Sequence, residues 1–165
     1  MRHCRRIGKL LTAGFVVAMA AVAGPSRAPA LISVQCQEVL GSFMLSETTD
    51  FSTQSTSFVN IPGATQGFNM SSLVGCVKVR FHTSARCSVT SASDICSIRA
   101  LVDGTQALPG RIQFAAENNR NVAYSFQWFT EVSQGNHTVR VQAAVGNAAT
   151  LFQLTAWSMD VEITD

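Results

Sequence analysis

The sequence has few of the side chains on which catalysis and metal binding depend. Only three of its 165 residues are histidine, and charged residues make up 13% of the chain. It contains neither a Gly-x-Ser-x-Gly nucleophile elbow nor a Cys-x-x-Cys pair of metal ligands. No stretch of ten residues has the hydrophobic period of an α-helix. These absences argue against a serine hydrolase, a zinc site and a helical fold, and we expect neither a metal nor a cofactor.

Residues 1–30 have the features of an export signal. Basic residues precede an apolar run of fourteen residues at 10–23, which is shorter than a bilayer-spanning helix. An Ala-Pro-Ala triplet at 28–30 fits a signal-peptidase site, and an Ala-Val-Ala triplet at 21–23 is the alternative. We therefore predict a cleaved signal peptide at 1–30 and a secreted or periplasmic protein without a stable membrane anchor.

Removal of residues 1–30 changes the charge of the chain from basic to acidic. Those residues contain five of the twelve Lys and Arg residues but none of the ten Asp and Glu residues. The remainder, residues 31–165, therefore has a formal charge of 7 − 10 = −3, which disfavours nucleic acid as a partner. Its length suits a single domain with one hydrophobic core.

The cysteines of residues 31–165 predict two disulfide bonds. Cys36, Cys76, Cys87 and Cys96 form an even set in a chain that we expect to reach an oxidising compartment. Of the three connectivities available, we favour Cys87–Cys96 together with Cys36–Cys76. The first pair closes a short polar loop, and a loop of this size contributes about 2–3 kcal/mol to stability in the chain-entropy model.

Alternation of apolar and polar residues predicts β-strands through most of residues 31–165. The strongest alternation, at 123–145, predicts a β-hairpin whose turn is Gly135-Asn136. Further strands are predicted at 74–82, 97–102 and 157–163, with turns at Pro62-Gly63 and Asp103-Gly104. Counting the weaker segments gives about nine or ten short strands, so we predict an all-β fold, a two-sheet antiparallel β-sandwich (jelly roll). Phe126, Trp128 and Trp157 are its expected core residues.

Several local motifs carry a resemblance to a known group. They are an Ile-Pro-Gly turn at 61–63, a V-x-V-x-F strand at 77–81, a Val-Asp-Gly turn at 102–104, and S-F-x-W followed by G-x-H-T-V-x-V-Q within 125–142. This combination resembles exported bacterial jelly-roll proteins, similar to the C1q and tumour-necrosis-factor type of β-sandwich. The resemblance implies the two-sheet fold and no particular activity, because such a fold hosts many functions.

The shortage of catalytic groups favours a non-enzymatic module that acts through surface binding or self-association. A carbohydrate-binding module is the alternative, since aromatic rings exposed in a row stack on sugar rings; Tyr124, Phe129 and Phe68 are the candidate residues. A small secreted hydrolase is the second alternative. It requires His82 or His137 to lie within hydrogen-bond reach of both a serine and a carboxylate.

Overall fold

The computed structural model describes residues 38–88, 94–114 and 120–165, and it confirms the predicted all-β fold. Within these ranges no helix is long and apolar enough to cross a bilayer. The predicted signal peptide and Cys36 lie outside the described residues and remain predictions. The strands are β1 (Val39–Glu47), β2 (Phe51–Thr53), β3 (Val59–Ser88), β4 (Cys96–Val102), β5 (Thr105–Gln106), β6 (Ile112–Phe114), β7 (Val122–Val145) and β8 (Leu151–Thr164).

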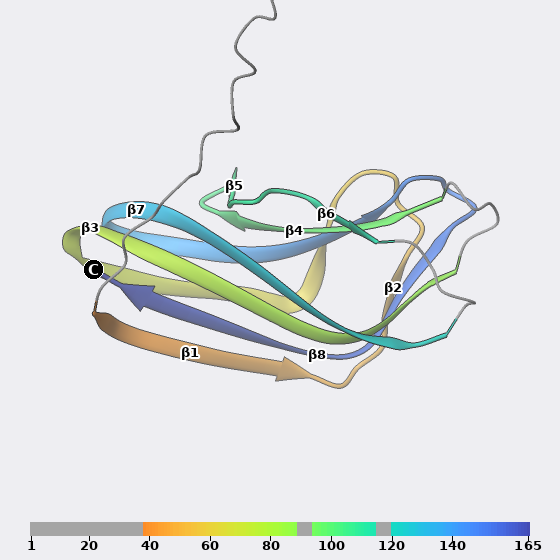
Figure 1. Ribbon diagram of the computed structural model, residues 1–165, viewed down its shortest axis with the longest axis horizontal. Helices are drawn as coiled ribbons and strands as arrows, with labels where there is room; N and C mark the ends of the chain where they lie inside the picture. The colour runs from red at the N-terminus through yellow and green to blue at the C-terminus, as the bar shows by residue number, and fades with distance from the viewer. Residues whose placement is uncertain (1–37, 89–93, 115–119) are drawn as a thin grey trace, which may run out of the picture. The chain divides into compact units, whose positions relative to one another are not determined.

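The two longest strands, β3 and β7, form one antiparallel ribbon that runs through both layers of the fold (Figure 1). Residues 74–85 of β3 pair with residues 133–122 of β7, and residues 65–70 pair with residues 140–135. The register of this ribbon shifts between Met70 and Val74, where both strands bend. The bend divides the ribbon between two sheets, so each long strand belongs to both.

Different strands extend the two halves of the ribbon. β8 pairs with residues 76–88 of β3, and β1 and β2 pair with β8; these strands and residues 122–133 of β7 form the first sheet. β4 pairs with residues 139–145 of β7, and the short strands β5 and β6 pair with β4; these strands and residues 59–70 of β3 form the second sheet. All of these pairings are antiparallel.

The predicted hairpin at 123–145 is wrong, and among the described residues the long strands β3 and β7 replace several of the expected short ones. The two arms do not pair with each other, because each arm of β7 pairs with a different part of β3. Gly135, with φ of 138°, lies at the point where β7 folds from one sheet into the other, so its two arms lie in different layers (Figure 1). β3 likewise continues through the expected turn at Pro62-Gly63, with a shift in register between Asn60 and Thr65.

One hydrophobic core fills the space between the two sheets. It contains Val77, Val79 and Phe81 from β3, and their predicted alternation with Lys78, Arg80 and His82 is confirmed. Phe126, Trp128 and Trp157 are also buried, as predicted. Rings from both sheets meet in this core: the Phe114 centroid of β6 lies 5.5 Å from that of Phe152 of β8 in an edge-on contact.

Two further local predictions are confirmed. Asp103 and Gly104 have φ of 51° and 81°, and they form the two-residue loop between β4 and β5. The Cys87–Cys96 disulfide joins β3 to β4, with 5.9 Å between the two Cα atoms. It therefore links the first sheet to the second, and it fits the predicted export to an oxidising compartment. The companion pair Cys36–Cys76 includes a residue outside the described ranges and stays a prediction.

Trp128 offers a test of this core. Its ring is fully buried, and Nε1 donates a hydrogen bond of 2.7 Å to the carbonyl oxygen of Gly110. We expect Trp128→Ala to lower the free energy of unfolding by about 3–5 kcal/mol, because it opens a cavity. Trp128→Phe retains an aromatic ring but leaves the Gly110 carbonyl without this donor, so we expect a smaller loss of about 1–3 kcal/mol. Urea denaturation measures both, and a near-neutral Trp128→Ala would contradict the buried position.

Candidate functional site

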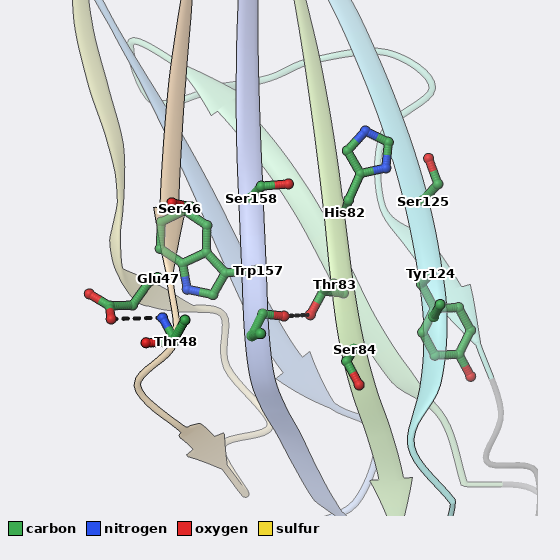
Figure 2. A pocket seen from close by; sticks show the side chains of 12 residues that line it. Ser46, Glu47, Thr48, His82, Thr83, Ser84, Tyr124, Ser125, Trp157 and Ser158 are labelled. Carbon is green, nitrogen blue, oxygen red and sulfur yellow. Dashed lines mark hydrogen bonds between the residues drawn. The ribbon is translucent and has the colours of Figure 1, made fainter.

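A shallow trough crosses the outer face of the first sheet at right angles to its strands (Figure 2). Its volume is about 530 Å³. Register places Ser46, Ser158, His82 and Ser125 side by side on β1, β8, β3 and β7, and these side chains form one row. The next outward row contains Ala156, Ser84 and Ala123, and Thr48 lies just after β1. We call this site the outer-face trough.

Differences in side-chain length create the trough. On one side, register aligns Met44, Asp160, Arg80 and Gln127 across the same four strands. On the other side, Arg86 of β3 faces Gln153 of β8, and its Nε donates a hydrogen bond of 3.0 Å to the Gln153 side chain. Two rows of short side chains thus lie between rows of long ones, and the depression between them runs across the sheet.

The floor of the trough is rigid because its backbone belongs to the sheet. Thr83, Trp157 and Tyr124 line it between the two short rows, and their side chains alternate toward the core side. Thr83 Oγ1 also donates a hydrogen bond of 2.8 Å to the carbonyl oxygen of Ala156, drawn in Figure 2. A ligand in the trough would therefore meet a preformed surface.

The trough carries little charge; hydroxyl and imidazole groups stand along it, but most of its accessible surface is apolar. Its ionisable side chains are His82 and Glu47. The Glu47 carboxylate accepts hydrogen bonds from the backbone N–H groups of Thr49 and Thr48 and from the Thr49 hydroxyl; these bonds lower its pKa and hold it toward the loop after β1. Among the described residues, the hydroxyls of Ser46, Ser125 and Ser158 donate no hydrogen bond to protein. These hydroxyls and the His82 ring are therefore available to a ligand.

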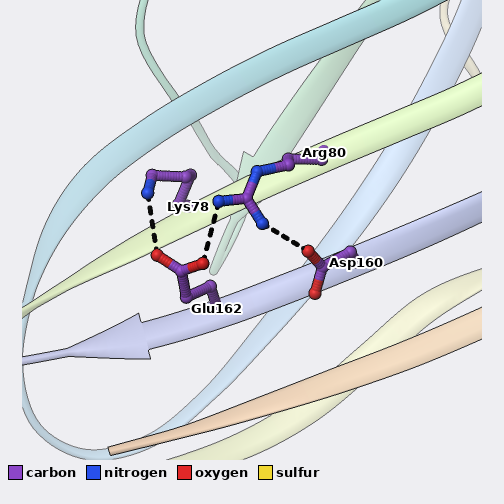
Figure 3. Close-up of polar contacts among 4 residues, drawn as sticks. All are labelled: Lys78, Arg80, Asp160 and Glu162. Atoms are coloured by element: carbon purple, nitrogen blue, oxygen red, sulfur yellow. Dashed lines mark hydrogen bonds and ion pairs between the residues drawn. The ribbon is translucent and has the colours of Figure 1, made fainter. Parts of the chain in front are cut away.

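On the Arg80 side of the trough, the charges neutralise one another (Figure 3). Arg80 contacts Asp160 at 2.5 Å and Glu162 at 2.8 Å, and Lys78 contacts the other oxygen of Glu162 at 2.7 Å. Hydrogen bonds from Lys78 and then Arg80 outweigh partial burial and lower the pKa of Glu162. With two cations facing two carboxylates, this ion-pair network presents little net charge to the neighbouring trough.

The three aromatic residues predicted as a stacking row do not lie in a row. Phe68 is 7% exposed and packs in the core, so it does not offer the exposed ring that the carbohydrate alternative requires. Tyr124 is half-buried on the core side, where its ring centroid lies 4.7 Å from that of Phe114. Phe129 is half-buried and lies beside Lys78 in the register of β3 and β7. Strand alternation therefore separates Tyr124 from Phe129, and the bend of the ribbon places Phe68 in the other sheet.

Neither histidine sits in the arrangement that the hydrolase alternative requires. His137 Nδ1 lies 2.6 Å from Asp103 Oδ2, but its Nε2 lies 2.7 Å from the backbone carbonyl oxygen of Ser133 and not from a hydroxyl. His82 has serines on both neighbouring strands, yet within the described ranges no carboxylate is within hydrogen-bond distance of its ring. A Ser-His-carboxylate relay is thus not assembled at either position in these ranges.

The contacts of His137 favour its protonated form. Both of its ring nitrogens face acceptors, so both hydrogen bonds form only when the ring carries two N–H groups. The bond to Asp103 outweighs partial burial and, with the Ser133 carbonyl, raises the pKa of His137. Burial acts to raise the pKa of Asp103, but hydrogen bonds from His137 and the Thr138 N–H outweigh it and lower that pKa. This pair ties the β4–β5 turn to the bend of β7.

Comparison with known proteins does not place the chain in a family. No protein-family model matches it, and no curated protein matches it. The predicted resemblance to the C1q and tumour-necrosis-factor type is therefore not supported by any matching family. Several solved structures share parts of its β-sheet architecture, at low sequence identity.

Three of these structures illustrate the likeness. A β-glucosidase from Paenibacillus barengoltzii matches 62% of this chain at 15% identity, with a TM-score of 0.37. Dimeric latent PorU from Porphyromonas gingivalis matches 81% of it at 10% identity, with a TM-score of 0.47. A family 35 carbohydrate binding module from Clostridium thermocellum matches 70% of it at 12% identity, with a TM-score of 0.35, over 90% of that module. The chain spans only 10% of the β-glucosidase and 14% of PorU.

The ion pair between His137 and Asp103 predicts a dependence of stability on pH. A raised histidine pKa contributes stability that is fully present below the usual value of 6.5 and is lost as the pH rises through the raised pKa. The lowered pKa of Asp103 contributes stability that is lost only as the pH falls through that lowered value. We therefore expect Asp103→Asn, which tolerates the same turn conformation, to destabilise the protein more at about pH 5.5 than at about pH 9.

Urea denaturation at both pH values measures this difference, and Asp50→Asn on an exposed loop residue is the matched control. An Asp103→Asn penalty that is equal at the two pH values would show that the ion pair contributes nothing beyond the turn itself.

Proposed function

We propose that the protein is a non-enzymatic binding module and that its outer-face trough binds a neutral glycan. The observation that carries this proposal is the row of Ser46, Ser158, His82 and Ser125 across four strands. Serine hydroxyls donate and accept hydrogen bonds, and an imidazole does both through its two nitrogens. Such a row complements the hydroxyl groups of a sugar, each of which also donates and accepts.

The charge of the site supports a neutral ligand. A phosphate or a uronic acid is bound best by a free cation. Arg80 and Lys78 are paired with Asp160 and Glu162. Arg86, on the other side of the trough, is engaged by the Gln153 side chain. A cationic ligand would need a free carboxylate, and the one in the lining, Glu47, is held by Thr48 and Thr49. A neutral polyhydroxylated ligand meets no such mismatch.

The size and shape of the trough support an oligosaccharide over a single sugar. Its volume of about 530 Å³ is within the range usual for small-molecule sites, which is about 300–1,000 Å³. It crosses four strands, and neighbouring strands lie about 4.8 Å apart, so its length is about 14 Å. This length suits several linked sugar units better than a single sugar.

Binding through this site depends on hydrogen bonds and not on an aromatic platform. Phe126, Trp128 and Trp157 are buried, and the Tyr124 ring packs on the core side. A neutral hydrogen bond contributes about 0.5–1.5 kcal/mol net, which corresponds to at most about a tenfold change in affinity. The affinity for one short oligosaccharide should therefore be weak, and each contact should make a modest difference.

Affinity gel electrophoresis against a panel of neutral and acidic polysaccharides tests the proposal. We expect retardation by at least one neutral polysaccharide. His82→Ala removes the imidazole, and Ser125→Gln fills the trough with a longer side chain; each should weaken binding by about three- to tenfold. Both positions are exposed, so both variants should retain the melting temperature of the wild type.

Two further variants sharpen the interpretation. Thr105→Gln, at an exposed position on the second sheet, is the matched control for Ser125→Gln and should bind like the wild type. Phe129→Ala tests the aromatic alternative, because this ring is half-buried away from the trough. Retardation that is lost in Phe129→Ala but unchanged in His82→Ala and Ser125→Gln would move the site away from the trough. Absence of retardation by every polysaccharide would contradict glycan binding.

A further inference from the structure

One edge of the first sheet is formed by β1, whose segment Gly41–Glu47 has little of the usual protection against pairing with another strand. β1 pairs with β8 on one side, and the described residues provide no strand on its other side (Figure 1). Alternate residues of an edge strand direct unpaired N–H and C=O groups outward, and proteins commonly shield them with lysine, proline or inward charges. The sequence of β1, VLGSFMLSE, contains no lysine, arginine or proline.

The side chains of β1 are also apolar on both faces of the sheet. Met44 is 80% exposed on the outer face, and Phe43 is 37% exposed on the inner face, where Leu45 packs only partly against the core. Exposed apolar residues on a continuous edge strand mark an interaction surface. The single charged residue, Glu47, is at the end of the strand, where its carboxylate accepts hydrogen bonds from Thr48 and Thr49.

We propose that β1 pairs antiparallel with β1 of a second copy of this chain, to form a two-fold symmetric dimer with a continuous sheet across the interface. The regular part of β1 is Gly41–Glu47, because the register with β8 shifts between Val39 and Gly41. Pairing of this segment with itself is centred on Met44, so that Met44 meets its symmetry mate. Phe43 then lies opposite Leu45, Ser42 opposite Ser46, and Gly41 opposite Glu47.

This register is self-complementary in both shape and charge. It sets apolar side chains opposite each other on each face, and cross-strand apolar pairs stabilise antiparallel sheets. The two copies of Glu47 lie at opposite ends of the paired segment, opposite glycine, so no like charges meet. A second copy therefore covers Met44 and Phe43 and satisfies the open backbone groups at no electrostatic cost.

The other edges of the two sheets fit a second copy less well. In the second sheet, β5 has two residues and β6 has three, which is too short for stable pairing. The β7 edge of the first sheet already accepts Leu108, whose N–H and carbonyl bond the carbonyl and N–H of Phe129. Residues 59–70 of β3, the opposite edge of the second sheet, contain Pro62 and a register shift between Asn60 and Thr65, both of which hinder pairing with another chain. Among the described edges, β1 thus combines a regular segment of seven residues with exposed apolar side chains.

The symmetry of this dimer has a consequence for the outer face. The two-fold axis of an antiparallel strand pair is perpendicular to the sheet, so the outer faces of both copies look in the same direction. Ser46, at one end of the trough, would then lie beside the interface. This consequence rests on the proposed glycan site, whereas the dimer itself does not depend on that site.

Sedimentation velocity of the purified protein expressed from the full-length chain tests the dimer, over about 10 µM to 1 mM, where weak dimers dissociate. We expect a reversible monomer–dimer equilibrium. Met44→Lys places two cations opposite each other at the centre and should weaken dimerisation by about tenfold or more. Because Met44 is exposed, this variant should fold normally. Val74→Lys, at a residue that is 64% exposed at the bend of β3, is the matched control and should dimerise like the wild type.

A charge-swap experiment identifies the pairing partner. Met44→Lys and Met44→Glu should each be monomeric alone, and an equimolar mixture of the two should dimerise, since opposite charges then meet across the axis. A strict monomer at the highest concentration would overturn the proposal. So would a dimer that Met44→Lys leaves unchanged, or a mixture that stays monomeric. None of these readouts involves a glycan, so failure of the dimer and failure of the binding site are distinguishable.

Discussion

The bent ribbon of β3 and β7 is the constraint on which the rest of the structure depends. Its two strands stay hydrogen-bonded to each other on both sides of the bend, so the two sheets cannot be built independently. Once the ribbon is bent, β8 and β1 extend one half and β4 extends the other. The apolar faces of the two halves then meet in one core around Trp128 and Phe81. The Cys87–Cys96 bond adds a covalent link between the same two layers.

The sequence predicted the composition of this core better than its connectivity. Alternation in 74–82 and 157–163 correctly separated core residues from outward ones, because each strand has one buried face. Alternation is a local property, however, and it does not reveal which strands pair. Gly135-Asn136 is a favourable turn sequence in either case, but only the partner strand decides whether the two arms pair with each other or lie in different sheets. The pairing partner of both arms is β3, which bends at 71–73, opposite the bend of β7.

The same limit explains why the trough could not be predicted, although its residues are ordinary. His82, Ser125, Ser158 and Ser46 are far apart in sequence, and only the register of four strands brings them into one row. The chain does carry a local signal, since short residues stand two apart in three of the four segments, as Ala156 and Ser158 do in β8; in β3, Ser84 follows His82. The aromatic residues gave a stronger signal but a misleading one, because strand alternation sends most of them into the core.

The location of the proposed binding site on the outer face agrees with how the core is packed. Large side chains such as Trp128, Phe81 and Phe152 are fully buried between the sheets, and a ligand could enter there only by displacing them. The outer face is a sheet surface, so its relief depends on the lengths of the side chains. The long, mutually paired side chains of Arg80 and Asp160 project from this surface, and the short serine and alanine side chains beside them leave a depression. The interior of this fold is filled by side chains that stabilise it. A site for a neutral ligand on the outer face is therefore shaped by the lengths of the side chains there and by the pairing of their charges.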